Sequence, residues 1–245
     1  MDQPTSLFNP AQHTLHLVVG SSGGIGAALT QQLSALGHTL ITTSRRGSDA
    51  DLQLDFEDDA SVAAFGPALA SRLDGAALRS VFICSGLLHA IGVRPERRIE
   101  ALKADAYTRV MRVNALGPLC LMGQLKALLA RDGPSQVSAV SARVGSIADN
   151  RLGGWYSYRC AKAALNMGFK TLAVELQRTH PACALTLFHP GTTDTALSAP
   201  FQRGVAPHKL FSTARAADQF VEVVRRRETE PGLQFLAWDG QPVAW

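Results

Sequence analysis

A glycine-rich segment near the N-terminus constrains the fold of this chain more than any other feature. Gly20, Gly24 and Gly26 lie between an apolar run, Leu15 to Val19, and a helix-like run, Ala27 to Leu36. Glycine permits the unusual φ of a tight turn and the close approach of a backbone or a phosphate. The N–H groups of such a strand-to-helix turn can bind a pyrophosphate. The alternative is a glycine-rich turn that holds no ligand.

Short apolar runs alternate with longer helical patterns along the chain, which is typical of β-α-β units. The alternation predicts a single-domain α/β fold of Rossmann type, a doubly wound sheet of about seven parallel strands with helices on both faces. The predicted strands are Leu15–Val19, Thr39–Thr43, Leu52–Asp55, Ser80–Cys84, Gln136–Ser141, Ala184–Phe188 and Gln234–Ala237. The predicted helices begin near Gly24, Ala60, Glu96, Ala106, Trp155 and Thr213.

No composition break divides the chain into two domains. Residues 1–13 are polar with two prolines and are expected to be a flexible segment before a dinucleotide-binding domain of residues 14–245. Within that domain, residues 195–210 hold Pro200, Gly204 and Pro207 among scattered apolar residues. This segment is interpreted either as a mobile loop that covers a substrate or as a plain surface loop.

Composition and charge exclude several classes of protein. The net charge of +4 comes from short local clusters, without the aromatic-interleaved basic stripe of a nucleic-acid-binding protein. No apolar run reaches the length of a membrane span, and the N-terminus lacks the apolar core of a secretory signal. The four cysteines form no CxxC pair, so neither a metal site nor a disulfide is expected: Cys84, Cys120, Cys160 and Cys183. A cytoplasmic protein with reduced thiols is predicted.

A tyrosine and a lysine four residues apart form the candidate catalytic pair. Tyr158 and Lys162 lie on one face of a predicted helix. The pKa of tyrosine is near 10 in water, and a neighbouring positive charge stabilises its phenolate and lets it exchange a proton near neutral pH. Taken alone, the spacing also fits a half-buried core tyrosine followed by a surface lysine. Tyr156 is followed four residues later by Cys160, so it lacks this partner and is assigned with Trp155 to a pocket wall or an interface.

Asn114 falls on the apolar stripe of its predicted helix, at helical spacing from Val110 and Gly117. A buried amide must find hydrogen-bond partners. A bound water that links Asn114 to Lys162 would satisfy it and provide a proton path. A purely structural amide is the alternative.

The residues after the second and third predicted strands bear on the choice of cofactor. Arg45 stands where an acidic residue would grip the ribose hydroxyl of NAD, and arginine favours the 2′-phosphate of NADP. A solvated arginine is the alternative. Asp55 can accept a hydrogen bond from the adenine amino group or cap the following helix, although Asp58 or Asp59 is better placed for capping.

Together these features resemble the short-chain dehydrogenase/reductase family, from Leu15 to about Trp245, and in detail its C-factor and sniffer-type carbonyl reductases. Val19 stands where the family's glycine motif usually has threonine. The resemblance places Asp55, Asn114, Tyr158 and Lys162 at the adenine, relay and catalytic positions. It implies that NADP(H) is favoured over NAD(H) and is bound by Gly20, Ser22, Gly24, Ile25, Gly26, Arg45, Asp55, Phe56, Cys84, Ser85, Gly86, Tyr158, Lys162, Pro190, Gly191, Thr192, Thr193 and Thr195.

The sequence departs from the family pattern at two places. Cys84-Ser85-Gly86 replaces the family's Asn-Ala-Gly, which keeps the glycine and loses an amide. Ala142 occupies the position of the family's substrate-polarising serine. Ser141 and Ser146 flank it as candidate replacements, and Ser141 is the one retained as a predicted catalytic residue. Period-two alternation directs Ser141 to the opposite side of a regular strand.

The leading hypothesis is an NADPH-dependent reductase that converts an aldehyde or ketone to an alcohol, with Tyr158 as proton donor. The alternatives are an NADP-binding regulatory or signalling protein with little turnover, because of Ala142, and an enzyme that oxidises an alcohol. A homodimer or homotetramer is predicted from two further apolar or small-residue faces, unless these faces pack inside one subunit: Leu121, Leu125 and Leu129, and Ala161, Ala164 and Gly168.

Overall fold

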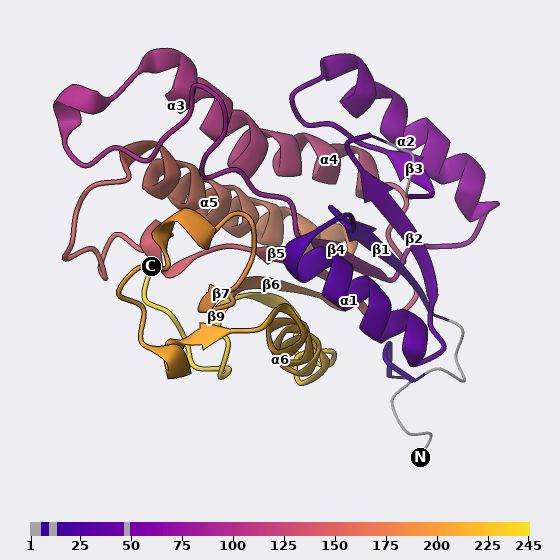
Figure 1. Ribbon diagram of the computed structural model, residues 1–245. Helices are drawn as coiled ribbons and strands as arrows, with labels where there is room; N and C mark the ends of the chain where they lie inside the picture. Colours follow the sequence, from indigo (N-terminus) through magenta and orange to yellow (C-terminus); the bar gives the residue numbers. More distant parts are fainter. Residues whose placement is uncertain (1–5, 10–13, 47–49) are drawn as a thin grey trace.

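Seven parallel strands form one twisted sheet at the centre of the molecule (Figure 1), in a computed structural model that describes residues 6–9, 14–46 and 50–245. The strand order is β3-β2-β1-β4-β5-β6-β9. The bounds of these strands are β1 Leu15–Val19, β2 Thr39–Ser44, β3 Leu52–Gln53, β4 Ser80–Ile83, β5 Ser135–Val140, β6 Cys183–His189 and β9 Gly232–Ala237. A separate small sheet pairs β7 Thr192–Thr193 with β8 Leu210–Phe211.

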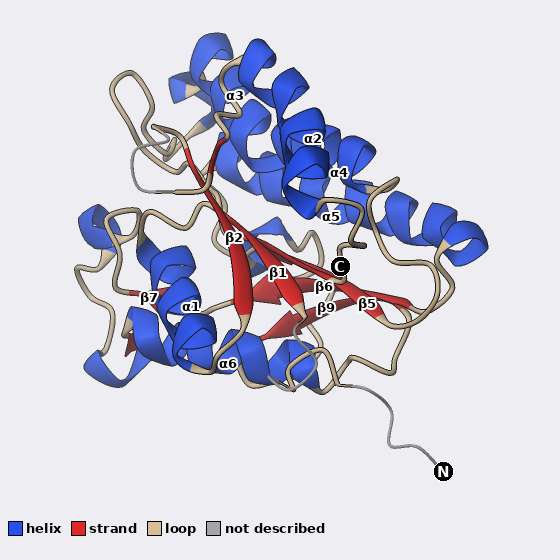
Figure 2. Cartoon of the chain, turned by 90° about the vertical axis from the view of Figure 1, so that its right-hand side faces the viewer, coloured by secondary structure: helices blue, strands red, loops and turns tan. Residues whose placement is uncertain are grey.

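Helices cover both faces of the large sheet (Figure 2), as the alternating pattern predicted. The α-helices are α1 Gly24–Ala35, α2 Asp59–Leu73, α3 Ala104–Met111, α4 Gly117–Leu125, α5 Tyr156–Thr179 and α6 Thr213–Arg225. The apolar residues of α2, α4 and α5 pack on one face of the sheet, and those of α1 and α6 pack on the other. Among the described residues, no helix has both the length and the hydrophobicity that crossing a membrane requires.

The strands divide their side chains between the two faces as period-two alternation requires. Leu17 and Val19 of β1 belong to the core under α2, α4 and α5, whereas Val18 belongs to the core under α1 and α6. Burial on both faces explains why the parallel strands read as continuous apolar runs. The carboxyl ends of all seven strands consequently meet at one edge of the sheet.

One predicted helix is wrong. No α-helix begins at Glu96; only the short 3-10 turn Ile99–Ala101 forms there. Pro95 precedes Glu96, and the carboxylate of Glu96 bonds to the backbone N–H and the hydroxyl of Ser157 on another element. A contact distant in sequence therefore determines the conformation of this segment.

The predicted substrate loop of residues 195–210 is partly structured. It contains the 3-10 turns Ala199–Phe201 and Pro207–Lys209, and it lies between the two strands of the small sheet. The pairing of β7 with β8 therefore closes this loop at its base.

The predicted flexible segment of residues 1–13 lies largely outside the described residues. Its described part, residues 6–9, is held on the domain: Leu7 is buried, and its N–H donates to Glu228 Oε2 at 3.1 Å. The hydroxyl of Ser6 donates to Glu228 Oε1 at 3.0 Å. The carboxylate of Glu228 thus fixes this part of the segment.

Most of the two faces considered for oligomerisation lie within the subunit. Leu121, Leu125 and Leu129 belong to its core, Ala161 is buried, and Ala164 packs against the same core. Gly168 contacts the side chain of Leu119 closely. The large apolar residues that remain exposed on these helices and the turn between α3 and α4 are Leu116, Met167 and Val174. Oligomerisation stays a prediction, with these three side chains as the surface that a partner would cover.

The turn between β1 and α1 needs glycine at defined positions. Gly20 and Gly24 have φ of +82° and +53°, in the left-handed region that favours glycine. A Cβ at Gly26 would lie 2.1 Å from the carbonyl oxygen of Gly20, so the first turn of α1 packs directly on the preceding loop. Gly23 caps α1 without a side chain, which leaves the first N–H groups of this helix free of side-chain capping.

We predict that Gly26→Ala destabilises the protein, because the added methyl group displaces the backbone of Gly20. The free energy of unfolding should fall by about 2 kcal/mol, the range typical of overpacking. Gly23→Ala is the matched control, since Gly23 has an extended backbone and open space around it. That control should cost only about 0.5 kcal/mol, through a poorer helix cap. Urea unfolding measures both, and equal costs would contradict the packing argument.

Two histidines pack together at the amino-terminal end of the sheet. The rings of His16 and His38 lie edge to face with centroids 4.6 Å apart, and Phe8 lies 5.3 Å from His16. Within the described residues, the ring nitrogens of both histidines are buried without a hydrogen-bond partner. Burial, reinforced by the neighbouring His38, lowers the pKa of His16 to about 3. The fold therefore holds His16 in its neutral form.

We predict a loss of stability on acidification that depends on His16. In the unfolded chain its pKa is about 6.5, so this contribution is complete above that pH and decreases as the pH falls toward 3. Between pH 7 and 5 the expected loss is about 2 kcal/mol. His16→Phe removes this titration, so the variant should lose that much less stability than the parent protein between the two pH values. Urea unfolding at both pH values tests this, and identical losses would refute it.

Candidate active site

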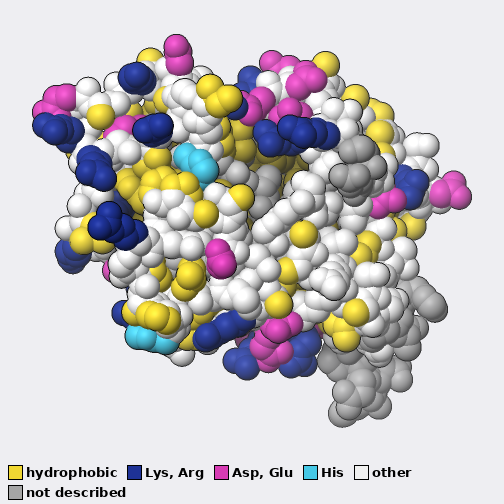
Figure 3. Space-filling model, in the orientation of Figure 1, with side chains coloured by type: hydrophobic (Ala, Val, Ile, Leu, Met, Phe, Trp, Pro, Cys, Tyr) yellow, Lys and Arg dark blue, Asp and Glu magenta, His cyan; other side chains and the backbone are white. Residues whose placement is uncertain are grey.

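A cleft of about 630 Å³ opens at the carboxyl ends of the strands. Figure 3 shows this hollowed face, with hydrophobic side chains gathered along one side of the hollow. Every predicted cofactor-binding or catalytic residue lines the cleft except Gly26 and Asn114. Gly26 lies beneath the glycine turn, and Asn114 lies behind Gly86, with its Oδ1 3.4 Å from where a Cβ of that glycine would be. The predicted residues are therefore assembled around one space.

The start of α5 is built from an unusual run of backbone conformations. Gly153, Gly154 and Trp155 all have positive φ, and for Trp155, at +53°, this conformation is strained. The backbone carbonyl of Glu96 accepts a hydrogen bond from the N–H of Trp155 at 2.5 Å. The carboxylate of Glu96 accepts from the N–H of Ser157 at 3.1 Å and from its hydroxyl. The Glu96 segment thus caps the helix that begins at Tyr156.

Tyr158 and Lys162 are both buried at the base of the cleft. The Lys162 ammonium lies 5.7 Å from the centre of the Tyr158 ring and donates to the carbonyl of Val140 at 2.8 Å. Burial raises the pKa of Tyr158 above its ordinary value and lowers the pKa of Lys162 to about 8. The sequence prediction that both side chains face one way is confirmed.

The serines near the missing polarising hydroxyl are engaged elsewhere. Ser141 follows β5 and borders the cleft, but its hydroxyl is buried and donates to Asn166 Oδ1 at 2.6 Å. The hydroxyl oxygen of Ser146 accepts from the N–H of Asp149 at 3.0 Å, and Ser146 does not line the cleft. Ala142 does line the cleft, so a methyl group faces the space. A catalytic role for Ser141 stays a prediction, and it would require the bond to Asn166 to open.

Asn114 fixes the loop after β4. It lies in the π-helical turn Arg112–Leu116, where its amide donates to the carbonyls of Leu87, at 2.7 Å, and Val110, at 2.9 Å. Its oxygen accepts from the N–H of Leu87 at 3.1 Å. Both amide hydrogens are thereby used within the chain, which matches the structural alternative. The water-mediated link to Lys162 stays a prediction.

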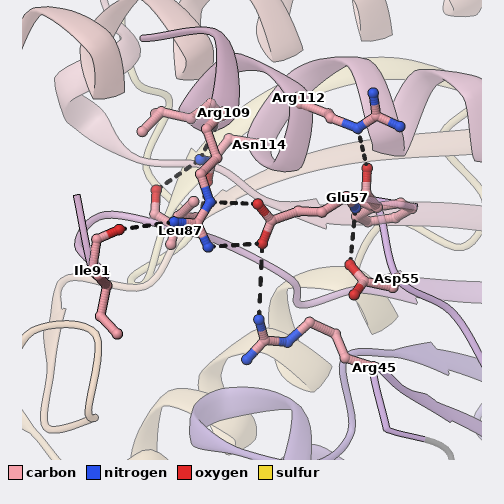
Figure 4. A network of polar contacts seen from close by, with 10 residues as sticks. Arg45, Asp55, Glu57, Leu87, Ile91, Arg109, Arg112 and Asn114 are labelled. Atoms are coloured by element: carbon pink, nitrogen blue, oxygen red, sulfur yellow. Dashed lines mark hydrogen bonds and ion pairs between the residues drawn. The ribbon is translucent and has the colours of Figure 1, made fainter. Parts of the chain in front are cut away.

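An ion-pair network lies at the other end of the cleft (Figure 4). One guanidinium edge of Arg109, formed by Nε and Nη2, donates to both carboxylate oxygens of Glu57, and Arg45 lies 4.0 Å from the same carboxylate. Asp55 accepts the N–H of Glu57 at 2.9 Å, while Asp58 caps α2 as expected. Arg45, Asp55, Glu57 and Arg109 all line the cleft. Arg45 and Asp55 were predicted from the sequence as cofactor-binding residues, whereas Glu57 and Arg109 were not.

Two further segments reach the cleft: Cys84-Ser85-Gly86, which follows β4, and the segment that follows β6. Cys84 is packed inside, and burial raises the pKa of its thiol to about 12, so the thiol stays protonated. The hydroxyl of Ser85 is buried without a hydrogen-bond partner among the described residues. Across the cleft, a Cβ added to Gly24 would lie 3.2 Å from the methyl group of Thr195. The segment after β6 therefore reaches across to the glycine turn.

One wall of the cleft is apolar. Leu87, Leu88, Trp155, Leu197 and Phe201 line it, and the rings of Trp155 and Phe201 lie 5.1 Å apart. Tyr156, which was assigned to the pocket wall or an interface, does not line the cleft. Local sequence patterns also did not predict His189, which lines the cleft. They did not predict the contacts of Glu96 and Asn166, whose partners Ser157 and Ser141 lie 61 and 25 residues away in the chain.

Known proteins resemble the chain over most of its length. A 1-hydroxy-2-glutathionyl-2-methyl-3-butene dehydrogenase from Rhodococcus sp. (strain AD45) is 29% identical over 237 residues, which cover 94% of this chain and 98% of that protein. The C-signal protein of Myxococcus xanthus is 32% identical over 138 residues, covering 56% of this chain and 77% of that protein.

Solved structures share the fold. A short-chain dehydrogenase/reductase from Burkholderia multivorans with bound NADP superposes with a TM-score of 0.80 at 26% identity, covering 95% of this chain and all of that one. The carbonyl reductase Sniffer of D. melanogaster has a TM-score of 0.77 at 22% identity, covering 95% of this chain and 99% of that one. The predicted resemblance to C-factor and sniffer-type proteins is confirmed.

The family model of the short chain dehydrogenases matches residues 14–205, which contain the glycine turn, Tyr158 and Lys162. The chain therefore belongs to the short-chain dehydrogenase/reductase family of NAD(P)-dependent oxidoreductases.

Proposed function

We propose that this protein is an NADPH-dependent reductase that converts an aldehyde or ketone to an alcohol. The observation that carries the proposal is the position of Tyr158 and Lys162, both buried at the base of a cleft between the glycine turn and an apolar wall. Structural relatives that are NADP-bound or NADPH-bound carbonyl reductases support this choice. The Rhodococcus relative is named as a dehydrogenase, so the oxidative direction stays an alternative.

The residues of the cleft fit a dinucleotide. The close contact of Gly26 with Gly20 and the free helix end at Gly23 form a cradle that any side chain at position 26 would disrupt. The buried hydroxyl of Ser85 has no hydrogen-bond partner among the described residues, and a polar ligand in the cleft would supply one. Arg45 lines the cleft after β2 with its side chain 67% exposed, as expected of a group that binds the 2′-phosphate of NADP.

Tyr158 and Lys162 carry out the acid–base part of the proposed reduction. When bound, the nicotinamide cofactor supplies the hydride. Tyr158, whose raised pKa keeps its hydroxyl protonated, donates the proton to the substrate oxygen. Lys162 then stabilises the phenolate with its positive charge. Its bond to Val140 holds the ammonium close to the Tyr158 ring.

The shape of the cleft favours an apolar substrate. The side chains around Tyr158 are mainly aliphatic or aromatic, and Trp155 lies with its ring centroid 6.2 Å from that of Tyr158. A predominantly apolar wall excludes water and binds hydrophobic groups through the area that it buries. Aromatic or branched aldehydes, ketones and diketones are therefore proposed as substrates.

A second candidate function is a nucleotide-binding regulatory protein with weak turnover. It is favoured by the methyl group of Ala142 in the cleft and by the engagement of Ser141 and Ser146 in other hydrogen bonds. Removing a donor that polarises a substrate oxygen typically slows the chemical step by about a hundredfold or more.

We predict that Tyr158→Phe abolishes carbonyl reduction and leaves NADPH binding unchanged, because it removes one hydroxyl and keeps the ring. The assay is NADPH consumption with a panel of aldehydes, ketones and diketones, alongside NADPH binding by fluorescence. Unchanged turnover in the variant would refute the assignment of Tyr158. Binding of NADPH by the parent protein with no turnover on the whole panel would instead favour the regulatory function.

We predict that Ala142→Ser raises the reduction rate by about tenfold or more, because it places a hydroxyl donor in the cleft beside Tyr158. The readout is kcat with a substrate that the parent protein reduces. Ser146→Ala serves as the comparison, since Ser146 does not line the cleft and should leave kcat within about twofold of the parent value. If Ala142→Ser gives no gain in kcat and Ser146→Ala lowers kcat strongly, the polarising role belongs to Ser146.

A further inference from the structure

We propose that Glu57 controls how strongly the cleft discriminates NADP from NAD, by placing a negative charge beside Arg45. The inference rests on the proposed NADP-dependent function and concerns a residue outside the acid–base pair. Its basis is the ion-pair network at the end of the cleft away from Tyr158, drawn in Figure 4. Arg45 and Glu57 both line the cleft, with Arg45 Nη1 4.0 Å from Glu57 Oε2.

The position of Glu57 is fixed from two sides. Its backbone N–H donates to Asp55 Oδ1 at 2.9 Å, and its two carboxylate oxygens bond to Nε and Nη2 of Arg109. Arg109 is itself held by a bond from Nη1 to the carbonyl of Ile91 at 2.9 Å. A bidentate pair of this kind sets orientation as well as distance. The Glu57 carboxylate therefore cannot leave Arg45 without breaking the bonds to Arg109.

The charge on Glu57 is present at neutral pH. The hydrogen bonds from Arg109, with the charges of Arg109, Arg45 and Arg112, keep the pKa of this carboxyl below its usual range. Glu57 has one-quarter of its side chain exposed, whereas the Arg45 side chain is 67% exposed. Arg45 is thus the exposed member of the network and Glu57 its more buried neighbour, held by Arg109.

This arrangement has opposite consequences for the two nucleotides. A 2′-phosphate bound by Arg45 would lie near the Glu57 carboxylate and be repelled by it. NAD carries a hydroxyl at that position and lacks the repelled charge. Glu57 therefore reduces the advantage that Arg45 gives to NADP. It also occupies Arg109, a second guanidinium that lines the cleft and would otherwise attract the phosphate.

The test is the substitution Glu57→Gln, which keeps the shape and one acceptor for Arg109 and removes the charge. Dissociation constants for NADP⁺ and NAD⁺ are measured by calorimetry or by protein fluorescence at low salt, without substrate. The expected result is tighter binding of NADP⁺ by about fivefold, the effect of one unit charge at about 4 Å in a largely aqueous setting. NAD⁺ binding should change by less than about twofold, and added salt should reduce the difference.

Asp59→Asn is the matched control. Asp59 lies two residues further along the chain, at the first position of α2, and also pairs with an arginine, Arg112. Its side chain is 92% exposed, and it does not line the cleft. This variant removes the same formal charge as Glu57→Gln. Because that charge lies outside the cleft, the ratio of the two dissociation constants should stay close to the parent value. An equal effect of both variants would overturn the inference and indicate a general effect of net charge.

The opposite sign of the Glu57→Gln effect would also overturn the inference. Weaker NADP⁺ binding in the variant would mean that Glu57 orients Arg45 for the phosphate and does not compete with it. An unchanged ratio would mean that the carboxylate has no influence on the nucleotide. The proposed function fails separately, if the parent protein binds neither nucleotide.

Discussion

A buried lysine bound to the end of a strand is the interaction on which the proposed catalytic arrangement depends. The bond from Lys162 to the carbonyl of Val140 joins α5 to β5, so the helix that carries Tyr158 is held on the sheet at its catalytic turn. The chain between them has to pass very close: a Cβ on Gly145 would lie 2.7 Å from the Cβ of Lys162. Burying an ammonium group costs free energy unless it is bonded. The carbonyl of Val140 and the nearby Tyr158 ring offset part of that cost.

The two ends of the cleft differ in how far their charged groups are exposed to water. At the end proposed to bind the nucleotide, Arg45, Glu57 and Arg109 are partly exposed ion-paired groups, so water screens their charges and permits them to exchange partners. At the proposed catalytic end, Tyr158 and Lys162 are buried among apolar side chains, where a proton transfer would be sensitive to its surroundings. Ala142 lines this second end and, unlike a serine, has no hydroxyl that could bind a water molecule there.

Local patterns predicted the sheet, five of the six proposed helix starts and the convergence of the glycine turn with Tyr158 and Lys162. They succeeded because strand alternation, helical spacing and glycine conformation are determined by neighbours in the chain. They failed at Glu96, whose partner Ser157 lies 61 residues away, and at Glu57, whose bond to Arg109 spans 52 residues. For Ser141, strand alternation does not apply, because β5 ends at Val140, and its partner Asn166 lies 25 residues away.

The capping of α5 by Glu96 links the shape of the proposed substrate pocket to the conformation of the helix that carries Tyr158. Leu87 and Leu88, in the loop after β4, form part of the wall that a substrate would touch, and the same connection continues to Glu96 and the start of the catalytic helix. A change that reshapes this loop for a larger or smaller substrate also pulls on the strained backbone of Trp155. The segment from Thr195 to Phe201 is joined to the same point, because the ring of Phe201 lies 5.1 Å from that of Trp155. A change of substrate range on either segment therefore also acts on the start of the helix that carries Tyr158.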